Sequence, residues 1–321
     1  MEKRIGIILL LLTGFCGIAR ADSDKSTGMH FLLTGPSAHN MGLSDGHTAS
    51  LSGASAIFLN PALLSMEASS SAVVSYMIWP ATDTQNSFAA VNFKRDRDAF
   101  GLAILSSLID DIPLRSGVSQ QPDGYFAVRY LSLAASYSRR FGPLSLGASG
   151  MYLFEQFYHE DASGYALNAG LALELMEKRV RLGTALKNLG SMQELSETAT
   201  QLPTMISIGA DVKLFQVSTS ALEEEIPFLF SLIADYNIPV NELNISTDEL
   251  KTQDDGYFNV GFEIGVSDMI DLRAAYRTGD TQRKYSFGAG LHISDFYVNY
   301  AYMPYDTGFG VAHAISLQYA F

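Results

Sequence analysis

The sequence has almost no cysteine, no long apolar run beyond its N-terminus and little positive charge. Its one cysteine is Cys16, so the 321 − 21 = 300 residues after position 21 form no disulfide, thiolate metal site or cysteine nucleophile. No later stretch offers 18 unbroken apolar residues, so a mature chain that sits in a membrane must cross it as strands. The 21 Lys and Arg against 34 Asp and Glu, scattered along the chain, disfavour nucleic acid as a partner.

The first 21 residues have the features of a secretory signal peptide. Lys3 and Arg4 form a positive start, and residues 5–15 form an apolar stretch too short to span a bilayer as a helix. Ala19-Arg20-Ala21 fits a small-x-small cleavage site. We therefore expect residues 1–21 to be removed, which leaves a mature protein that starts at Asp22. An uncleaved anchor helix is the alternative, and the shortness of the apolar stretch disfavours it.

Residues 71–321 are a succession of segments in which apolar and polar or small side chains alternate. Period two is the period of a β-strand, and about ten residues suffice to cross a membrane. Fourteen such segments are expected, near 71–79, 85–94, 99–107, 125–140, 143–157, 162–175, 179–188, 204–215, 227–237, 256–266, 269–277, 284–293, 295–303 and 311–321. Their even number, with short connections alternating with long polar ones, predicts an all-β fold, a transmembrane antiparallel β-barrel.

The side chains of these segments favour a barrel over a soluble β-sandwich. The exposed face of a sandwich carries Thr, Lys, Glu and Ser, whereas the non-apolar face here is dominated by Gly, Ala, Ser and Asn. The 16 Tyr and 19 Phe can supply the aromatic girdles of a membrane barrel. The final segment places Ile315, Leu317, Tyr319 and Phe321 opposite Ser316, Gln318 and Ala320. A closing strand that ends in an aromatic residue is typical of the outer-membrane assembly signal, so the bacterial outer membrane is the expected location.

Residues 22–70 differ from the strands that follow. They are rich in Ser, Gly, Ala and Asn, and they contain too little apolar surface for a core of their own. We interpret them as a plug, or hatch, inside the lumen of the barrel. Asn60-Pro61-Ala62 is the sharpest local motif, because Pro fixes its own φ and pushes Asn60 out of the helical region. The motif predicts a tight turn where the plug joins the wall, and it is also a candidate gate element.

Several motifs together resemble the PorV/PorQ family of outer-membrane proteins, which are related to FadL-type barrels. They are Gly35-Pro36-Ser37-Ala38-His39-Asn40-Met41-Gly42, Asn60-Pro61-Ala62, Pro122-Asp123-Gly124-Tyr125-Phe126, Leu186-Lys187-Asn188-Leu189-Gly190, Phe287-Gly288-Ala289-Gly290 and Tyr300-Ala301-Tyr302-Met303-Pro304. The resemblance covers nearly all of the mature chain, and it implies a fourteen-stranded barrel with an N-terminal plug. Met41-Gly42 would be a second plug turn. The sequence departs from the family where Leu63 replaces the Gly that commonly follows Asn-Pro-Ala.

Three function classes remain open at this point. The resemblance ranks first an accessory or attachment protein of type IX secretion, with secreted proteins or secretion-system components as partners. A FadL-like channel for hydrophobic small molecules of the long-chain fatty-acid type is the alternative, and a structural barrel is the third. Outer-membrane lipid is an expected partner in each case. We expect no enzyme, no cofactor and no metal site, because neither a nucleophile-elbow motif nor a paired-His metal motif is present.

Overall fold

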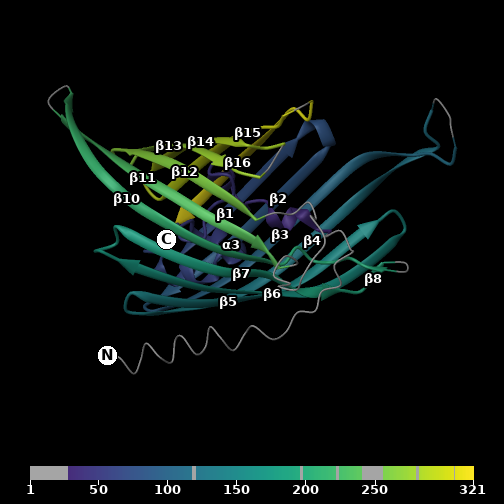
Figure 1. The fold of residues 1–321 in the computed structure, drawn as a ribbon, viewed down its shortest axis with the longest axis horizontal. Coiled ribbons are helices and arrows are strands. Elements are labelled where there is room, and N and C mark those ends of the chain that lie inside the picture. Colours follow the sequence, from purple (N-terminus) through teal and green to yellow (C-terminus); the bar gives the residue numbers. More distant parts are fainter. Residues whose placement is uncertain are drawn as a thin grey trace, which may run out of the picture.

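The chain folds into one closed β-barrel that contains its own N-terminal segment (Figure 1). The computed structural model describes residues 28–117, 121–195, 198–221, 224–240, 256–279, 282–306 and 308–321. The expected signal peptide and its cleavage site lie outside these residues.

Fourteen antiparallel strands form the wall. They are β1 (Ser71–Trp79), β2 (Thr84–Arg95), β3 (Asp98–Leu114), β4 (Gly124–Phe141), β5 (Leu144–Phe157), β6 (Glu160–Leu175), β7 (Val180–Met192), β10 (Met205–Ala221), β11 (Glu224–Pro239), β12 (Tyr257–Val266), β13 (Ile270–Arg277), β14 (Tyr285–Ile293), β15 (Phe296–Pro304) and β16 (Val311–Ala320). The short strands β8 (Glu194–Leu195) and β9 (Thr198–Ala199) form a separate hairpin between β7 and β10.

The first and last strands of the wall pair with each other and close the ring. Ser71 stands opposite Ala320, and the Phe321 backbone N–H donates to the Ser70 carbonyl at 2.9 Å. Closure gives each strand two hydrogen-bonded neighbours, which is the condition for a sheet to exist in lipid. The predicted fourteen-stranded barrel is therefore confirmed.

The two ends of the barrel differ. At one end the strands are joined by tight turns at 96–97, 142–143, 176–179, 267–269 and 294–295, and we call this the short-turn end. The other is the long-loop end. Residues 108–124, between two of the predicted strands, were expected to form a long loop. This is wrong in part, because residues 108–114 extend β3. They pair with β4 in a hairpin that reaches beyond the neighbouring strands. The β10–β11 hairpin extends likewise at the short-turn end, and the two hairpins protrude on opposite sides of Figure 1.

Side chains alternate between an apolar outer surface and a small, polar inner one. Along β12, Phe258 and Phe262 are exposed on the outside, whereas Asn259 is buried on the inside. The same alternation places Ile315 on the outer surface of β16 and Ser316 in the interior. An apolar exterior with a polar lumen is the arrangement that a lipid bilayer stabilises. No helix in the described part of the chain is long and apolar enough to cross a membrane.

Residues 28–70 lie within the barrel, and we call residues 28–66 the lumen segment. It consists of short helical turns joined by irregular stretches: η1 (His30–Leu33), α2 (Ala38–Met41), η2 (Gly53–Ser55), α3 (Ala56–Leu59) and η3 (Pro61–Met66). A further turn, η4 (Pro80–Thr82), joins β1 to β2. The inward residues of the wall are mostly small, and this leaves the space that the segment fills.

We expect the last residue to matter for insertion more than its inward neighbour. The Phe321 ring lies on the outer surface, 5.7 Å from the Tyr319 ring centroid and 6.3 Å from that of Phe93, whereas Gln318 contacts Gly53 in the lumen. Deletion of Phe321 should lower the amount of heat-modifiable protein in outer membranes severalfold, and Gln318→Ala should leave it near the unmodified level. Equal losses in the two variants would contradict a role of the outer face of β16 in assembly.

Candidate functional site

The Asn60-Pro61-Ala62 turn ties the lumen segment to itself and to the wall. Asn60 is extended at φ −155°, and its Oδ1 accepts a hydrogen bond from the Ala62 backbone N–H at 3.1 Å, which caps η3. Its Nδ2 donates to the Thr48 carbonyl at 2.7 Å and to the Leu171 carbonyl on β6 at 3.2 Å. Proline at the first position of the helical turn loses no needed hydrogen bond. One buried amide therefore joins two parts of the lumen segment to the barrel.

Three glycines of adjacent strands form the surface on which this turn rests, and we call them the glycine seat. They are Gly147 on β5, Gly170 on β6 and Gly183 on β7, with Gly147 directly opposite Gly170. A Cβ at these positions would lie 2.4 Å from the Pro61 carbonyl carbon, 1.9 Å from Asn60 Oδ1 and 2.0 Å from the Thr48 carbonyl oxygen. Only glycine allows such an approach of wall and turn. The sequence analysis missed the seat, although glycine inside a strand is a known signal of close backbone approach.

Met41 and Gly42 lie at a different part of the wall. Helix α2 contacts β14, β15 and β16, and Met41 is buried in a small apolar cluster with Met77 and Met303. A Cβ on Gly42 would lie 3.0 Å from the Gly288 Cα. The two predicted plug motifs are therefore separate anchors, one on β5–β7 and the other on β14–β16. Their role in gating stays a prediction.

Asp45 is held by two arginines, Arg277 at the end of β13 and Arg283 in the connection to β14. Arg277 Nη2 lies 2.7 Å from Asp45 Oδ2, and Arg283 also donates to this oxygen. The Gly35 backbone N–H donates to Oδ1 at 2.8 Å. Burial raises the pKa of the Asp45 carboxyl, but the charges of Arg283 and Arg277 outweigh burial, so the pKa is lowered from its usual value. This carboxylate therefore stays ionised at neutral pH and anchors the middle of the lumen segment.

Further polar contacts anchor the stretch from Thr48 to Gly53. Asp235 Oδ1 on β11 accepts from the Thr48 backbone N–H at 2.9 Å, and Arg181 Nη1 on β7 donates to the Ala49 carbonyl at 3.3 Å. Glu67 Oε1 accepts from the backbone N–H groups of Ser52 at 3.0 Å and Gly53 at 2.7 Å. Arg181 in turn pairs with Glu174 and Asp211. Wall and segment thus share one polar network in this region.

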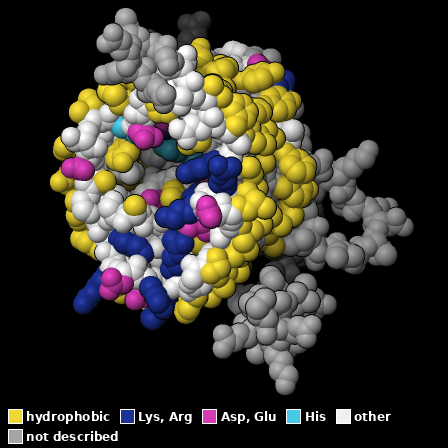
Figure 2. Space-filling view, turned by 90° about the vertical axis from the view of Figure 1, so that its left-hand side faces the viewer, with side chains coloured by type: hydrophobic (Ala, Val, Ile, Leu, Met, Phe, Trp, Pro, Cys, Tyr) yellow, Lys and Arg dark blue, Asp and Glu magenta, His cyan; other side chains and the backbone are white. Residues whose placement is uncertain are grey.

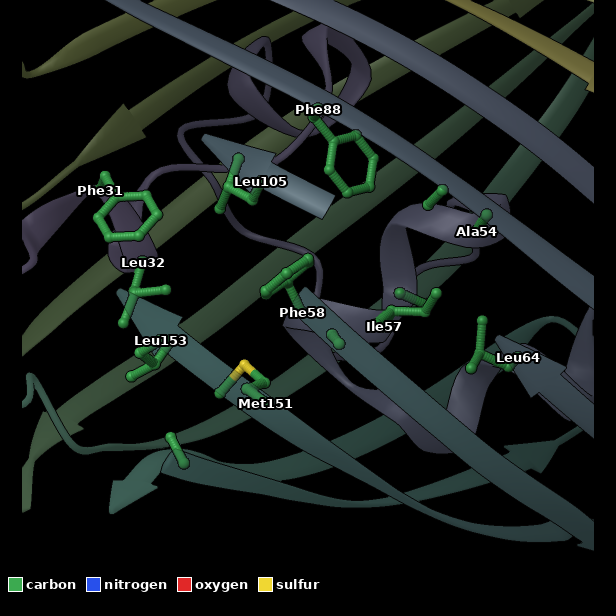
Figure 3. Close-up of a cluster of buried hydrophobic side chains, with 14 of the residues drawn as sticks. Phe31, Leu32, Ala54, Ile57, Phe58, Leu64, Phe88, Leu105, Met151 and Leu153 are labelled. Atoms are coloured by element: carbon green, nitrogen blue, oxygen red, sulfur yellow. The ribbon is translucent and has the colours of Figure 1, made fainter. Parts of the chain in front are cut away.

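The opposite part of the lumen is apolar, which is unusual for a barrel interior. We define the apolar cluster by its large members: Met29, Phe31, Leu32, Ile57, Phe58, Leu63, Leu64, Met66, Val73, Phe88, Leu105, Met151, Leu153, Met192 and Leu202. Figure 3 shows side chains of the lumen segment and the wall pointing toward one another. The Phe58 and Phe88 ring centroids are 6.0 Å apart, and Phe31 stacks on Tyr130 at 5.4 Å. The sequence analysis did not find this cluster.

The short-turn mouth of the barrel is hollowed and charged. Figure 2 shows Lys and Arg along one side of the opening and histidine side chains within it. At this end of the barrel Arg140 pairs with Glu174 at 2.5 Å, and Lys94 Nζ donates to the Ser65 carbonyl. In the part of the chain that the structure describes, no group of three or more His, Cys, Asp or Glu is arranged to hold a metal ion.

The predicted assembly residues Ile315, Leu317, Tyr319 and Phe321 lie on the outer surface of the closing strand and its end, away from the lumen segment. Tyr319 stacks on Phe296 of β15 with ring centroids 4.9 Å apart. Their use as an assembly signal stays a prediction. The candidate site is therefore the lumen segment with its two anchors, its polar network and the apolar cluster.

Comparison with known proteins identifies the fold. Similar solved structures include the toluene transporter TbuX of Ralstonia pickettii, with a TM-score of 0.62 and 12% identity over 91% of this chain and 100% of that one. The toluene transporter TodX of P. putida gives 0.58 and 11% over 90% and 99%, and a FadL homologue of Pseudomonas aeruginosa gives 0.50 and 12% over 89% and 98%. No family model and no curated protein sequence matches the chain. The chain thus has the fold of FadL-like outer-membrane barrels, and nothing at the level of sequence singles out PorV/PorQ.

We expect Gly147→Ala to displace the turn at Pro61. The added methyl group would meet backbone atoms of Pro61 and Ala62 within 2.6 Å, so a rotamer change cannot relieve the clash. The barrel should still insert, but liposomes that contain it should swell in small sugars at least several times faster than with the unmodified protein. Gly150→Ala is the matched control, since its methyl group would meet only Leu167 Cδ2 at 3.9 Å. Equal swelling rates for the two variants would contradict the role of the glycine seat.

Proposed function

We propose that this protein is an outer-membrane channel for small uncharged hydrophobic molecules, with the lumen segment as its gate. The observation that carries the proposal is the apolar cluster, the largest group of buried apolar side chains in the described part of the chain. The short-turn end would face the periplasm, because outer-membrane barrels have short turns there and longer loops outside.

The apolar cluster runs along the barrel rather than across it. At the long-loop end it includes Phe31, which stacks on Tyr130 of the wall. Nearer the short-turn end it includes Ile57 and Leu64, both of which contact Gly101. A hydrophobic molecule that moves along these side chains exchanges water for apolar contact at about 25 cal/mol per Å². The position of the cluster therefore suits a path between the two ends.

The chemistry of the cluster favours a neutral molecule over a fatty acid. Lys94 reaches the cluster only at its short-turn end, where its Nζ donates to the Ser65 carbonyl. Farther along the cluster lies Glu155 on β5, which is buried and accepts a hydrogen bond from Thr200 Oγ1 at 2.6 Å. A ligand carboxylate beside Glu155 would lose its hydration next to another carboxyl group, at a cost of several kcal/mol.

The comparisons support this proposal more than the secretion alternative. Two of the similar structures are described as toluene transporters, and another, with a TM-score of 0.57, as a monoaromatic hydrocarbon channel. The order of the two functions expected from the sequence is thereby reversed. A role in type IX secretion stays a prediction that rests on the resemblance of motifs.

The lumen segment would gate the path because its contacts are of two kinds. Phe58 and Leu64 fill the space along the apolar cluster, whereas Asn60, Asp45 and Thr48 hold the segment through polar contacts. A hydrophobic ligand competes only with the apolar contacts of Phe58 and Leu64. We therefore infer a local rearrangement of apolar side chains during passage, with the polar anchors retained.

Uptake measurements test the proposal. Cells that carry the protein should accumulate labelled toluene faster than cells without it, whereas oleate uptake should not change. Leu105→Asn places an amide in the apolar cluster, and we expect it to lower toluene uptake about fivefold to tenfold, since each buried methylene contributes about 0.8 kcal/mol.

Ile233→Asn is the control for Leu105→Asn. Ile233 is equally buried and faces the lumen, but it belongs to a separate small cluster with Leu43 and Ala275. We expect toluene uptake near the unmodified level in this variant. Oleate uptake without toluene uptake, or equal losses in both variants, would contradict a path for neutral molecules along the apolar cluster.

A further inference from the structure

Two histidines of the lumen segment face each other inside the barrel. His39 lies on α2 and His47 lies in the irregular stretch that follows, and their ring centroids are 4.8 Å apart. His47 is 1% exposed, and neither of its ring nitrogens makes a hydrogen bond of normal geometry within the described part of the chain. A buried imidazole of this kind is tolerated only while it is uncharged.

Among charged side chains, Arg273 of β13 has the largest electrostatic effect on the two histidines. Its side chain is fully buried, and it donates to Glu263 on β12 at 2.5 Å and to Asp271 at 2.8 Å. It also donates to Asn299 on β15 at 2.8 Å. The carboxylates of Glu263 and Asp271 are therefore both ion-paired with the one guanidinium beside the histidines.

Most of the other charged groups that face the pair also have partners. His292 of β14 lies 2.8 Å from Asp271, and Asp45 is bound by Arg277 and Arg283. Asp235 of β11 differs: it accepts from the Thr48 backbone N–H through Oδ1, and its Oδ2 has no hydrogen-bond partner among the described residues. A proton on His39 or His47 would add positive charge next to Arg273, whose own carboxylate partners are already engaged.

Burial and charge act in the same direction on both imidazoles. Burial, followed by the charge of Arg273, lowers the pKa of His47 from 6.5 to about 3, although a hydrogen bond to the His39 backbone and the charge of Asp45 act in the opposite direction. Burial, followed by the charge of Arg273, holds the pKa of His39 well below its usual value. Both rings are therefore neutral while they are packed. In water they would titrate near 6.5.

We propose that His39 and His47 form an acid-sensitive switch, in which protonation releases the lumen segment from β12–β14 and opens the short-turn mouth. The packed state is fully stabilised above the pKa of the free rings and loses this stability as the pH falls toward the pKa of the packed rings. At pH 5 His47 alone would shift the balance toward release by about thirtyfold, and His39 would act in the same direction. The inference goes beyond the proposed function, because it does not depend on which molecule passes.

Protons can reach the pair from the lumen, because His39 is partly exposed. Asp45 would not titrate in the same pH range, because its pKa lies below its usual value. A change in conductance between pH 7.5 and 5 therefore does not come from protonation of Asp45 and loss of its ion pairs with Arg277 and Arg283.

Conductance of the intact protein in planar bilayers tests the switch. We expect conductance to rise at least tenfold between pH 7.5 and 5.0, and we expect no rise in the double variant His39→Gln, His47→Gln. His313→Gln is the matched control: His313 is bonded to Tyr300 Oη at 2.7 Å in an exposed contact, and its loss should leave the rise intact. A flat profile in the unmodified protein, or an unchanged rise in the double variant, would overturn the proposal.

Two further measurements separate the switch from other causes. The protein must keep its heat-modifiable band at pH 5.0, since loss of that band would mean that the barrel unfolds, and this would also overturn the proposal. If the double variant does not assemble, hydrogen exchange of the unmodified protein decides: residues 36–50 should lose protection at pH 5.0 while β1–β16 keep theirs. Uniform retention of protection would overturn the switch. Toluene uptake at pH 7.5 tests the channel independently.

Discussion

Closure of the sheet between β1 and β16 is the constraint on which the rest of the structure depends. In lipid an unpaired strand edge is too costly to persist, so the ring must close, and with fourteen strands it encloses a lumen wider than inward side chains of ordinary size can fill. The inward residues here are mostly Ser, Asn, Ala and Gly. The remaining space is filled by 28–66, a stretch of the same chain with little regular structure. Its conformation is therefore set by the wall, through contacts that differ from one side of the barrel to the other.

Apolar and charged side chains are unevenly distributed in the lumen. The apolar cluster lies against β1–β7, whereas Asp235, Glu263, Arg273 and Arg277 belong to β11–β13. Phe58 and Leu64 of the lumen segment belong to the apolar cluster, whereas Asp45 is bound by Arg277 and Arg283. The contacts of Asp45 therefore use other strands than hydrophobic passage does, although the Asn60 anchor lies on β6, beside the apolar cluster. The same separation lets a change in protonation act on the anchors while the apolar contacts stay as they are.

The wall could be predicted from the sequence, and most of the site could not. Period-two alternation located all fourteen strands, because each must present an apolar face to lipid, and this leaves a mark on every second residue. The Asn60-Pro61-Ala62 turn was also readable, since Asn and Pro have local conformational preferences. The glycine seat could not be predicted, because Gly147, Gly170 and Gly183 are needed for contacts with Pro61, Asn60 and Thr48, which lie about 85 to 135 residues away in the sequence. The ion pairs of Asp45 could not be predicted either, because their partners Arg277 and Arg283 lie more than 200 residues further along the chain.

A gate must be held firmly enough to close the lumen and loosely enough to move, and the nature of the contacts reconciles these demands. Shape-matched contacts such as Pro61 on Gly147 fix position but add little attraction, because glycine offers few atoms to pack against. Attraction comes from the apolar cluster and from a few buried hydrogen bonds and ion pairs, above all those of Asn60 and Asp45. Such contacts are strong while intact and costly once one partner is lost. Motion of the segment is therefore best achieved by altering charge at one point, because apolar packing spread along the wall offers no single group on which a signal could act.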